Sequence, residues 1–179
     1  GHAALAIAGS LLLTLAAKTQ VPFWPVPMTL QTLAILAIAA AYGRNLAVAT
    51  LLLYLAQGLA GLPVLAGPDA GPAYFAGPTA GFLAGFVVAA AIVGEAADRG
   101  LSRSPLRLFA VMLAADIVLF AMGFAWLAVG FVSAQTGATL GVSIAWANGV
   151  APFILSDLVK LAIAALAIPA AWKLIGTRA

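Results

Sequence analysis

Apolar residues dominate six stretches of the chain, and short polar or Pro/Gly-rich segments separate these stretches. A helix that crosses a bilayer needs about 20 mostly apolar residues. Apolar residues do not alternate with polar ones at 30–41 or 84–93, as they must in the strands of a barrel. The pattern predicts an all-α integral membrane protein with one six-helix transmembrane bundle over residues 3–179. The expected spans are 3–17, 29–42, 45–59, 79–97, 106–132 and 152–173.

The composition excludes several classes of protein. Hydrophobic residues make up 65% of the 179 residues and charged residues only 7%, too few to cover the surface of a soluble domain. The chain has no cysteine, so disulfides and thiolate metal sites are excluded. Enzyme motifs and basic runs are missing as well, so we expect no enzyme, no cofactor or metal, and no nucleic-acid partner. Gly1 and the sole histidine, His2, are interpreted as a tag remnant.

Lysine and arginine are distributed unequally between the two ends of the predicted spans. One side carries a single basic residue, Lys18, whereas the other side carries six. Because basic residues concentrate in cytoplasmic loops, we expect both termini in the cytoplasm. The Pro/Gly-rich loops after the first and third spans, and the loop before the sixth, then form structured outer loops over an outward-facing pocket. The six cytoplasmic residues are Arg44, Arg99, Arg103, Arg107, Lys173 and Arg178.

Three charged residues lie well inside predicted spans, away from the span ends, where such groups are costly and commonly functional. Asp157 and Lys160 are three residues apart and therefore share one helix face. They form either the polar floor of a small-ligand pocket or an internal ion pair that binds nothing. Asp116 is expected near mid-bilayer, where it pairs with Lys160 or hydrogen-bonds a neighbouring helix.

Small residues recur at intervals of four in the fourth predicted span. Gly77, Gly81 and Gly85 form a face that lets two helix backbones approach closely. Helix packing is the favoured interpretation of this face. The same helix opens at Gly77 and Thr79, where free N–H groups and the positive end of the helix dipole favour a carboxylate or carbonyl. Gly77 and Thr79 are therefore also candidate pocket residues.

Other spans carry small or polar residues with two possible roles. Ala4 and Ala8, in the first span, form a face for internal packing or for docking of a partner membrane protein. Gln31 and Tyr54 each carry a polar group that needs a partner in lipid. Each faces either a ligand or another helix.

Three separated motifs resemble those of one membrane-protein family. The segment VPFWPVPMTLQTLA (21–34) resembles a P-x-P-x-TLQ signature after the first helix. GLAGLPVLAG (58–67) and FAGPTAGFLAGF (75–86) resemble a GLPVFAGG…GPTGGYLxGF run, and SDLVK (156–160) resembles a motif of the last helix. The chain is thereby similar to BioY proteins, the biotin-binding S components of energy-coupling-factor (ECF) transporters.

The resemblance implies a function and a set of partners. It implies capture of biotin from the outer side of a prokaryotic cytoplasmic membrane, for ATP-driven uptake. It implies a membrane scaffold, the T component, and two ATPase subunits as partners. It also implies six helices with cytoplasmic termini. Ala4 and Ala8 match the small-residue face through which the family contacts its scaffold.

By the same resemblance, several positions match the family's pocket. Asp157 and Lys160 match its acidic and basic pair. We expect Asp157 to accept from the ureido N–H groups of biotin and Lys160 to supply a cation or a hydrogen bond, or the reverse. Tyr54, Trp146 or Phe23 would cover the apolar ring. The remaining matches are Thr29 and Gln31 in the TLQ motif, and Gly77, Thr79 and Gly81 in the GPTGG motif, where Ala80 replaces a glycine.

Two alternatives stay open at the level of sequence. One is an S component for another vitamin, such as thiamine or riboflavin, which competition binding would distinguish. The other is a membrane scaffold without a transport role, held together by its Gly and Ala faces. This second alternative predicts no saturable binding of a small ligand.

Overall fold

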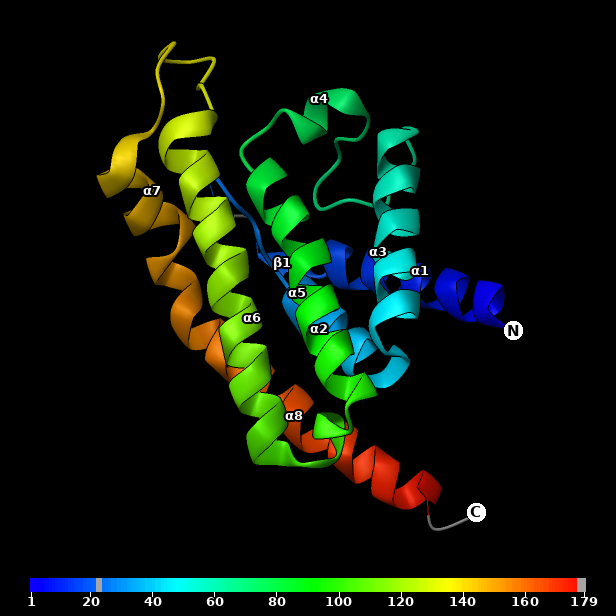
Figure 1. The fold of residues 1–179 in the computed structure, drawn as a ribbon. Helices are drawn as coiled ribbons and strands as arrows, with labels where there is room; N and C mark the ends of the chain where they lie inside the picture. The colour runs from blue at the N-terminus through cyan, green and yellow to red at the C-terminus, as the bar shows by residue number, and fades with distance from the viewer. Residues whose placement is uncertain (22–23, 177–179) are drawn as a thin grey trace.

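A computed structural model describes residues 1–21 and 24–176 of the chain and is mostly helical (Figure 1). Phe23, an expected pocket residue, and Arg178, one of the expected cytoplasmic basic residues, lie outside the described residues. The α-helices are α1 (His2–Lys18), α2 (Gln31–Tyr42), α3 (Arg44–Leu59), α4 (Pro72–Phe75), α5 (Ala80–Asp98), α6 (Pro105–Ala125), α7 (Gly141–Gly149) and α8 (Ile154–Gly176). The remaining elements are the antiparallel strands β1 (Gln20–Val21) and β2 (Met28–Thr29), the 3-10 turns η1 (Leu101–Arg103) and η3 (Ala151–Phe153), and the π turn η2 (Trp126–Gly130).

Helix α2 lies at the centre of the bundle, in contact with α1, α3, α5 and α8. Eight of its 12 residues are buried. A helix that is apolar on all sides is stable only when other elements surround it, and α2 is apolar on all sides beyond its first two residues, Gln31 and Thr32. Figure 1 shows α5 in front of α2, flanked by α3 and α6. The two polar residues at the start of α2, Gln31 and Thr32, are therefore buried inside the bundle.

Two glycines of α5 allow it to pack closely along α6. A Cβ atom on Gly85 would lie 3.0 Å from both the Cα and the carbonyl oxygen of Leu119. On Gly81 it would lie 2.4 Å from the Cβ of Trp126 and 2.7 Å from the carbonyl oxygen of Met122. These neighbouring atoms cannot rotate away, so both positions require the smallest residue. The prediction that this face serves helix packing is confirmed for Gly81 and Gly85.

The described residues contain three helices long and apolar enough to cross a bilayer, at Ala80–Asp98, Pro105–Gly130 and Gly141–Gly176. Helices α1 and α2 are apolar but shorter, with 17 and 12 residues. In Figure 1, α1 runs across the direction of α5 and α6 rather than parallel to them. The helices agree with an all-α membrane protein, while six spans remain a prediction.

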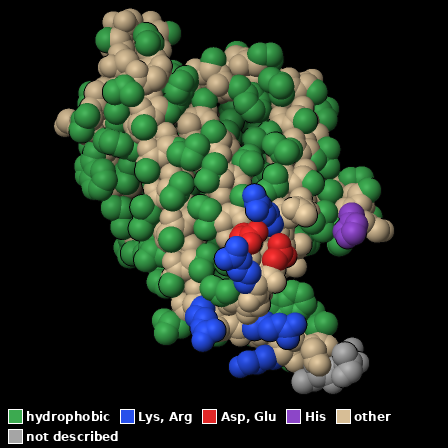
Figure 2. Space-filling view, in the orientation of Figure 1, with side chains coloured by type: hydrophobic (Ala, Val, Ile, Leu, Met, Phe, Trp, Pro, Cys, Tyr) green, Lys and Arg blue, Asp and Glu red, His purple; other side chains and the backbone are tan. Residues whose placement is uncertain are grey.

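Charged side chains gather at the end of the molecule where α5 ends and α6 begins, and hydrophobic side chains cover most of the rest of this face (Figure 2). Glu95 joins Arg44 of α3, at 3.3 Å, to Arg99, at 2.7 Å. The guanidinium of Arg103 lies 5.9 Å from the centre of the Trp172 ring. Three of the basic residues predicted to share one side of the membrane therefore lie at the same end of the molecule. They are Arg44, Arg99 and Arg103.

Candidate functional site

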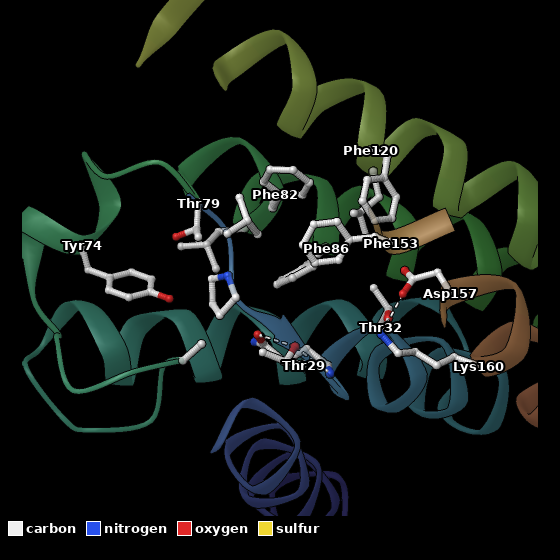
Figure 3. Close-up of a pocket in the computed structure, with 16 residues that line it drawn as sticks. Thr29, Thr32, Tyr74, Thr79, Phe82, Phe86, Phe120, Phe153, Asp157 and Lys160 are labelled. Carbon is white, nitrogen blue, oxygen red and sulfur yellow. Dashed lines mark hydrogen bonds and ion pairs between the residues drawn. The ribbon is translucent and has the colours of Figure 1, made fainter. Parts of the chain in front are cut away.

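A narrow cavity of about 50 Å³ is lined by residues of α2, α5, α6 and α8 and by the loops that precede α2 and α5 (Figure 3). Most of its polar residues lie at two ends, and Thr29 lies between them. Thr32, Asp157 and Lys160 form one end, and Tyr74 and Thr79 the other. The aromatic residues that line the cavity between these ends are Phe82, Phe86, Phe120 and Phe153.

The first turns of α8 carry the charged end of the pocket. The ammonium of Lys160 donates to Asp157 Oδ1 at 2.7 Å and to the hydroxyl of Thr32 at 3.3 Å. Asp157 is 1% exposed and Lys160 8%. The second carboxylate oxygen, Asp157 Oδ2, is buried and has no hydrogen-bond partner among the described residues. Since an unpaired buried acceptor is costly, a ligand with an N–H donor that entered the pocket would relieve this cost.

The start of α2 is held by a chain of hydrogen bonds. The backbone N–H of Gln31 donates to the hydroxyl of Thr29 at 3.1 Å, and its side-chain amide donates to the Tyr54 hydroxyl at 3.0 Å. Tyr54 in turn donates to the carbonyl oxygen of Val64 at 3.0 Å. Thr29 and Gln31 line the pocket, whereas Tyr54 is fully buried behind them. Tyr54 therefore orients Gln31 and does not face the cavity.

A second, wider cavity of about 340 Å³ lies beside the other end of the pocket, and the two share Tyr74, Thr79, Pro27 and Ala66 as lining residues. Gly77 lines only the wider cavity. Burial raises the pKa of the Tyr74 hydroxyl, so this group stays protonated and able to donate near neutral pH. The two neighbouring cavities together extend from the α8 ion pair to the loops before α5.

Besides Tyr54, two residues expected at the pocket lie elsewhere. Gly81 packs against α6 and does not line either cavity. Trp146 is 52% exposed and packs edge-on against Phe124, with ring centroids 6.4 Å apart. Helix α7 lies against α6 and η2, which places Trp146 in a separate apolar cavity of about 450 Å³. The expectation that Trp146 covers the ligand ring is therefore not supported by its position.

Several lining residues were not singled out from the sequence, although spacing could have identified some of them. Phe82 and Phe86 follow Thr79 by three and seven residues, so all three share one helix face. Phe153 precedes Asp157 by four residues. Phenylalanine side chains in an apolar helix resemble ordinary core residues in the sequence. Only their helical spacing from a candidate polar residue, such as Thr79 or Asp157, distinguishes them.

Comparison with known proteins identifies the family. A profile described as the BioY family matches residues 1–177. The chain belongs to the BioY family. It is 37% identical to the biotin transporter BioY of Rhizobium etli over 152 residues, covering 80% of this chain and 76% of that one. It is 32% identical to the probable biotin transporter BioY of Pyrococcus horikoshii, covering 87% and 86%.

A solved structure shows the fold of this BioY chain independently. The crystal structure of the S-component for biotin from an ECF-type ABC transporter matches with a TM-score of 0.78 and 21% sequence identity, over 96% of this chain and 90% of that chain. The resemblance drawn from three motifs is confirmed. The relatives are named as transporters and not as enzymes, in agreement with the prediction that the chain is not an enzyme.

Proposed function

We propose that this chain is the S component that captures biotin from the outer side of a prokaryotic cytoplasmic membrane for ATP-driven uptake. The observation that carries the proposal is the buried Asp157–Lys160 pair, with one carboxylate oxygen unpaired, at the end of an aromatic pocket. The printed names of the BioY relatives support the choice of biotin.

The chemistry of biotin matches the two ends of this pocket. Asp157 Oδ2 accepts from a ureido N–H group, and Lys160, which already donates to Asp157 and Thr32, directs its third N–H toward the ureido oxygen. The phenylalanine rings cover the apolar thioether ring. The carboxylate tail then extends into the wider cavity beside Thr79, at the N-terminus of α5. This arrangement assigns the ureido ring, and not the tail, to Lys160.

The membrane topology and the partners belong to the same proposal. The chain forms one domain that crosses the membrane six times, with both termini in the cytoplasm, and the charged end of the molecule faces the cytoplasm. Ala4 and Ala8 are exposed on α1 and form the surface that docks on the T component. Two ATPase subunits, bound to the T component, supply the energy.

Equilibrium titration of the detergent-purified protein tests the proposal, with biotin as the ligand and thiamine and riboflavin as competitors. We expect saturable one-to-one binding of biotin that neither competitor displaces. Asp157→Asn and Lys160→Gln should each weaken binding at least tenfold, which corresponds to about 1.4 kcal/mol. Arg107→Gln is the control, because Arg107 is exposed at the start of α6.

Other outcomes of this titration identify the alternatives. Displacement of biotin by thiamine or riboflavin at equal concentration would assign the pocket to another vitamin. A folded sample that binds none of the three compounds would exclude a capture function and leave the ion pair with a structural role.

A further inference from the structure

One buried carboxyl oxygen lies outside the pocket described above. Asp116 is on α6 and 9% exposed, and its Oδ1 atom has no hydrogen-bond partner among the described residues. The Lys160 ammonium donates to Asp157 and Thr32, instead of forming the expected pair with Asp116. A buried acceptor without a hydrogen bond is costly. Asp116 can therefore accept a hydrogen bond from a ligand.

This carboxyl group lines an apolar cavity of about 450 Å³ between α6, α7 and α8. Figure 1 shows α7 beside α6, on the side opposite α5. The volume lies within the range of small-molecule sites, about 300–1,000 Å³. Of the ten lining residues, only Asp116 and Trp146 carry a polar side-chain atom. A buried water needs about two to four polar partners, so an apolar molecule suits this cavity better than water does.

The surroundings of the cavity indicate where such a molecule comes from. Three of its apolar lining residues, Ile117, Ile154 and Leu158, are exposed at the surface, and exposed apolar patches mark sites of contact with membranes or partners. Asp116 lies in the middle part of the apolar segment Pro105–Gly130, about 16 Å or more along the helix from either end. Phospholipid headgroups do not reach this depth, so the occupant is a small molecule dissolved in the hydrocarbon.

We propose that this cavity binds an apolar molecule from the bilayer that carries one hydroxyl group, of the chemical class of a medium-chain alcohol. The hydroxyl donates to Asp116 Oδ1, and the alkyl chain packs against Phe124 and Trp146. The site is separate from the proposed biotin pocket, since the two cavities share only Phe120. The proposal requires the chain to lie in a membrane but does not depend on the identity of the transported ligand.

Tryptophan fluorescence tests the proposal, because a bromine atom quenches an indole ring that it contacts. The full chain is reconstituted in phosphatidylcholine vesicles, whose headgroup offers no hydrogen-bond donor, and titrated with a medium-chain alcohol that carries a terminal bromine. The bromoalkane of equal length is the matched reagent, compared at equal mole fraction in the bilayer. We expect saturable quenching by the alcohol, with an apparent affinity about tenfold higher than that of the bromoalkane, because only the alcohol donates to Asp116.

Four variants locate the site. Trp146→Phe should remove the saturable part of the quenching and leave that of the other three tryptophans. Asp116→Leu should bind the alcohol and the bromoalkane alike. Ala121→Phe, an exposed lining residue of α6, should fill the cavity and remove saturable quenching by both reagents. Ala114→Phe, exposed on the same helix but outside the cavity, is the matched control and should behave as the wild type.

Several results would overturn the proposal. Equal affinities of the wild type for the two reagents would mean that Asp116 binds no hydroxyl, and this result is decisive even if no variant folds. A preference for the alcohol that persists in Asp116→Leu would have the same meaning. Saturable quenching that survives in Trp146→Phe or Ala121→Phe, or displacement of the alcohol by excess biotin, would place the alcohol elsewhere. Biotin binding is measured in its own titration, so failure here is distinct from failure of the proposed function.

Discussion

Replacing Lys160 by Met removes the cation that pairs with the buried carboxylate of Asp157. The methionine side chain has a similar length and no charge, so the change acts mainly on electrostatics. Asp157, 1% exposed, loses its 2.7 Å ion pair and keeps its charge in an apolar site. Breaking a buried pair by removal of one partner costs about 3–5 kcal/mol. For a chain of this size that corresponds to a fall in Tm of about 6–20 °C.

Thermal unfolding in detergent, followed by circular dichroism, measures this loss. Asp157→Asn should cost less, about 1.5–3 kcal/mol, because the side-chain oxygen of asparagine can still accept the hydrogen bond from the Lys160 ammonium. The double variant Asp157→Asn/Lys160→Met should be more stable than Lys160→Met alone, because it removes both members of the pair. Arg107→Met is the exposed control. A Lys160→Met variant within about 1 °C of the wild type, or additive losses in the double variant, would refute the reasoning.

Two further predictions concern the packing of α5 and the exposed face of α1. Gly85→Ala should destabilise the fold by about 1–3 kcal/mol in the same unfolding assay, because the new Cβ meets the Leu119 backbone at 3.0 Å. Gly176→Ala is the control and should not destabilise the fold, because a Cβ at Gly176 meets open space. Equal losses of stability in the two variants would contradict the packing argument. Ala8→Trp should leave biotin affinity unchanged and abolish co-purification with the T component. Ala114→Trp is the control and should preserve co-purification, because Ala114 is exposed on α6. Co-purification of Ala8→Trp with the T component would exclude α1 as the docking surface.

The positions of most long helices follow from the sequence because apolar runs and their Pro/Gly breaks are local features. The break between the second and third runs is one example, since the chain turns at Gly43 with a φ of 76°. The pairing of Asp157 with Lys160 also follows from local spacing on one helix. The motif positions Thr29, Gln31 and Thr79 all line the same cavity as this pair.

The remaining site residues depend on how helices rotate against each other, which local spacing does not specify. Gly81 lies two residues after Thr79 and so points to another face of α5, toward α6. Trp146 has the amphipathic side chain expected over a ligand ring, but α7 packs against α6 and η2, where Trp146 contacts Phe124. Asp116 lines the apolar cavity that contains Phe124 and Trp146, and this position likewise depends on the register between α6 and α8, for which the sequence contains no marker.

The Tyr54 hydroxyl provides a test of whether the hydrogen-bond chain behind the pocket prepares it for a ligand. Tyr54→Phe keeps the ring but removes the acceptor for the Gln31 amide and the donor to Val64, both at 3.0 Å. One such bond contributes about 0.5–1.5 kcal/mol, so the Kd for biotin should rise about two- to tenfold through a less ordered Gln31. Tyr42→Phe, which loses a bond to the Leu5 carbonyl, is the matched control measured in the same titration. Equal affinities for the two variants would mean that Gln31 is held by its own contacts and that Tyr54 serves stability alone.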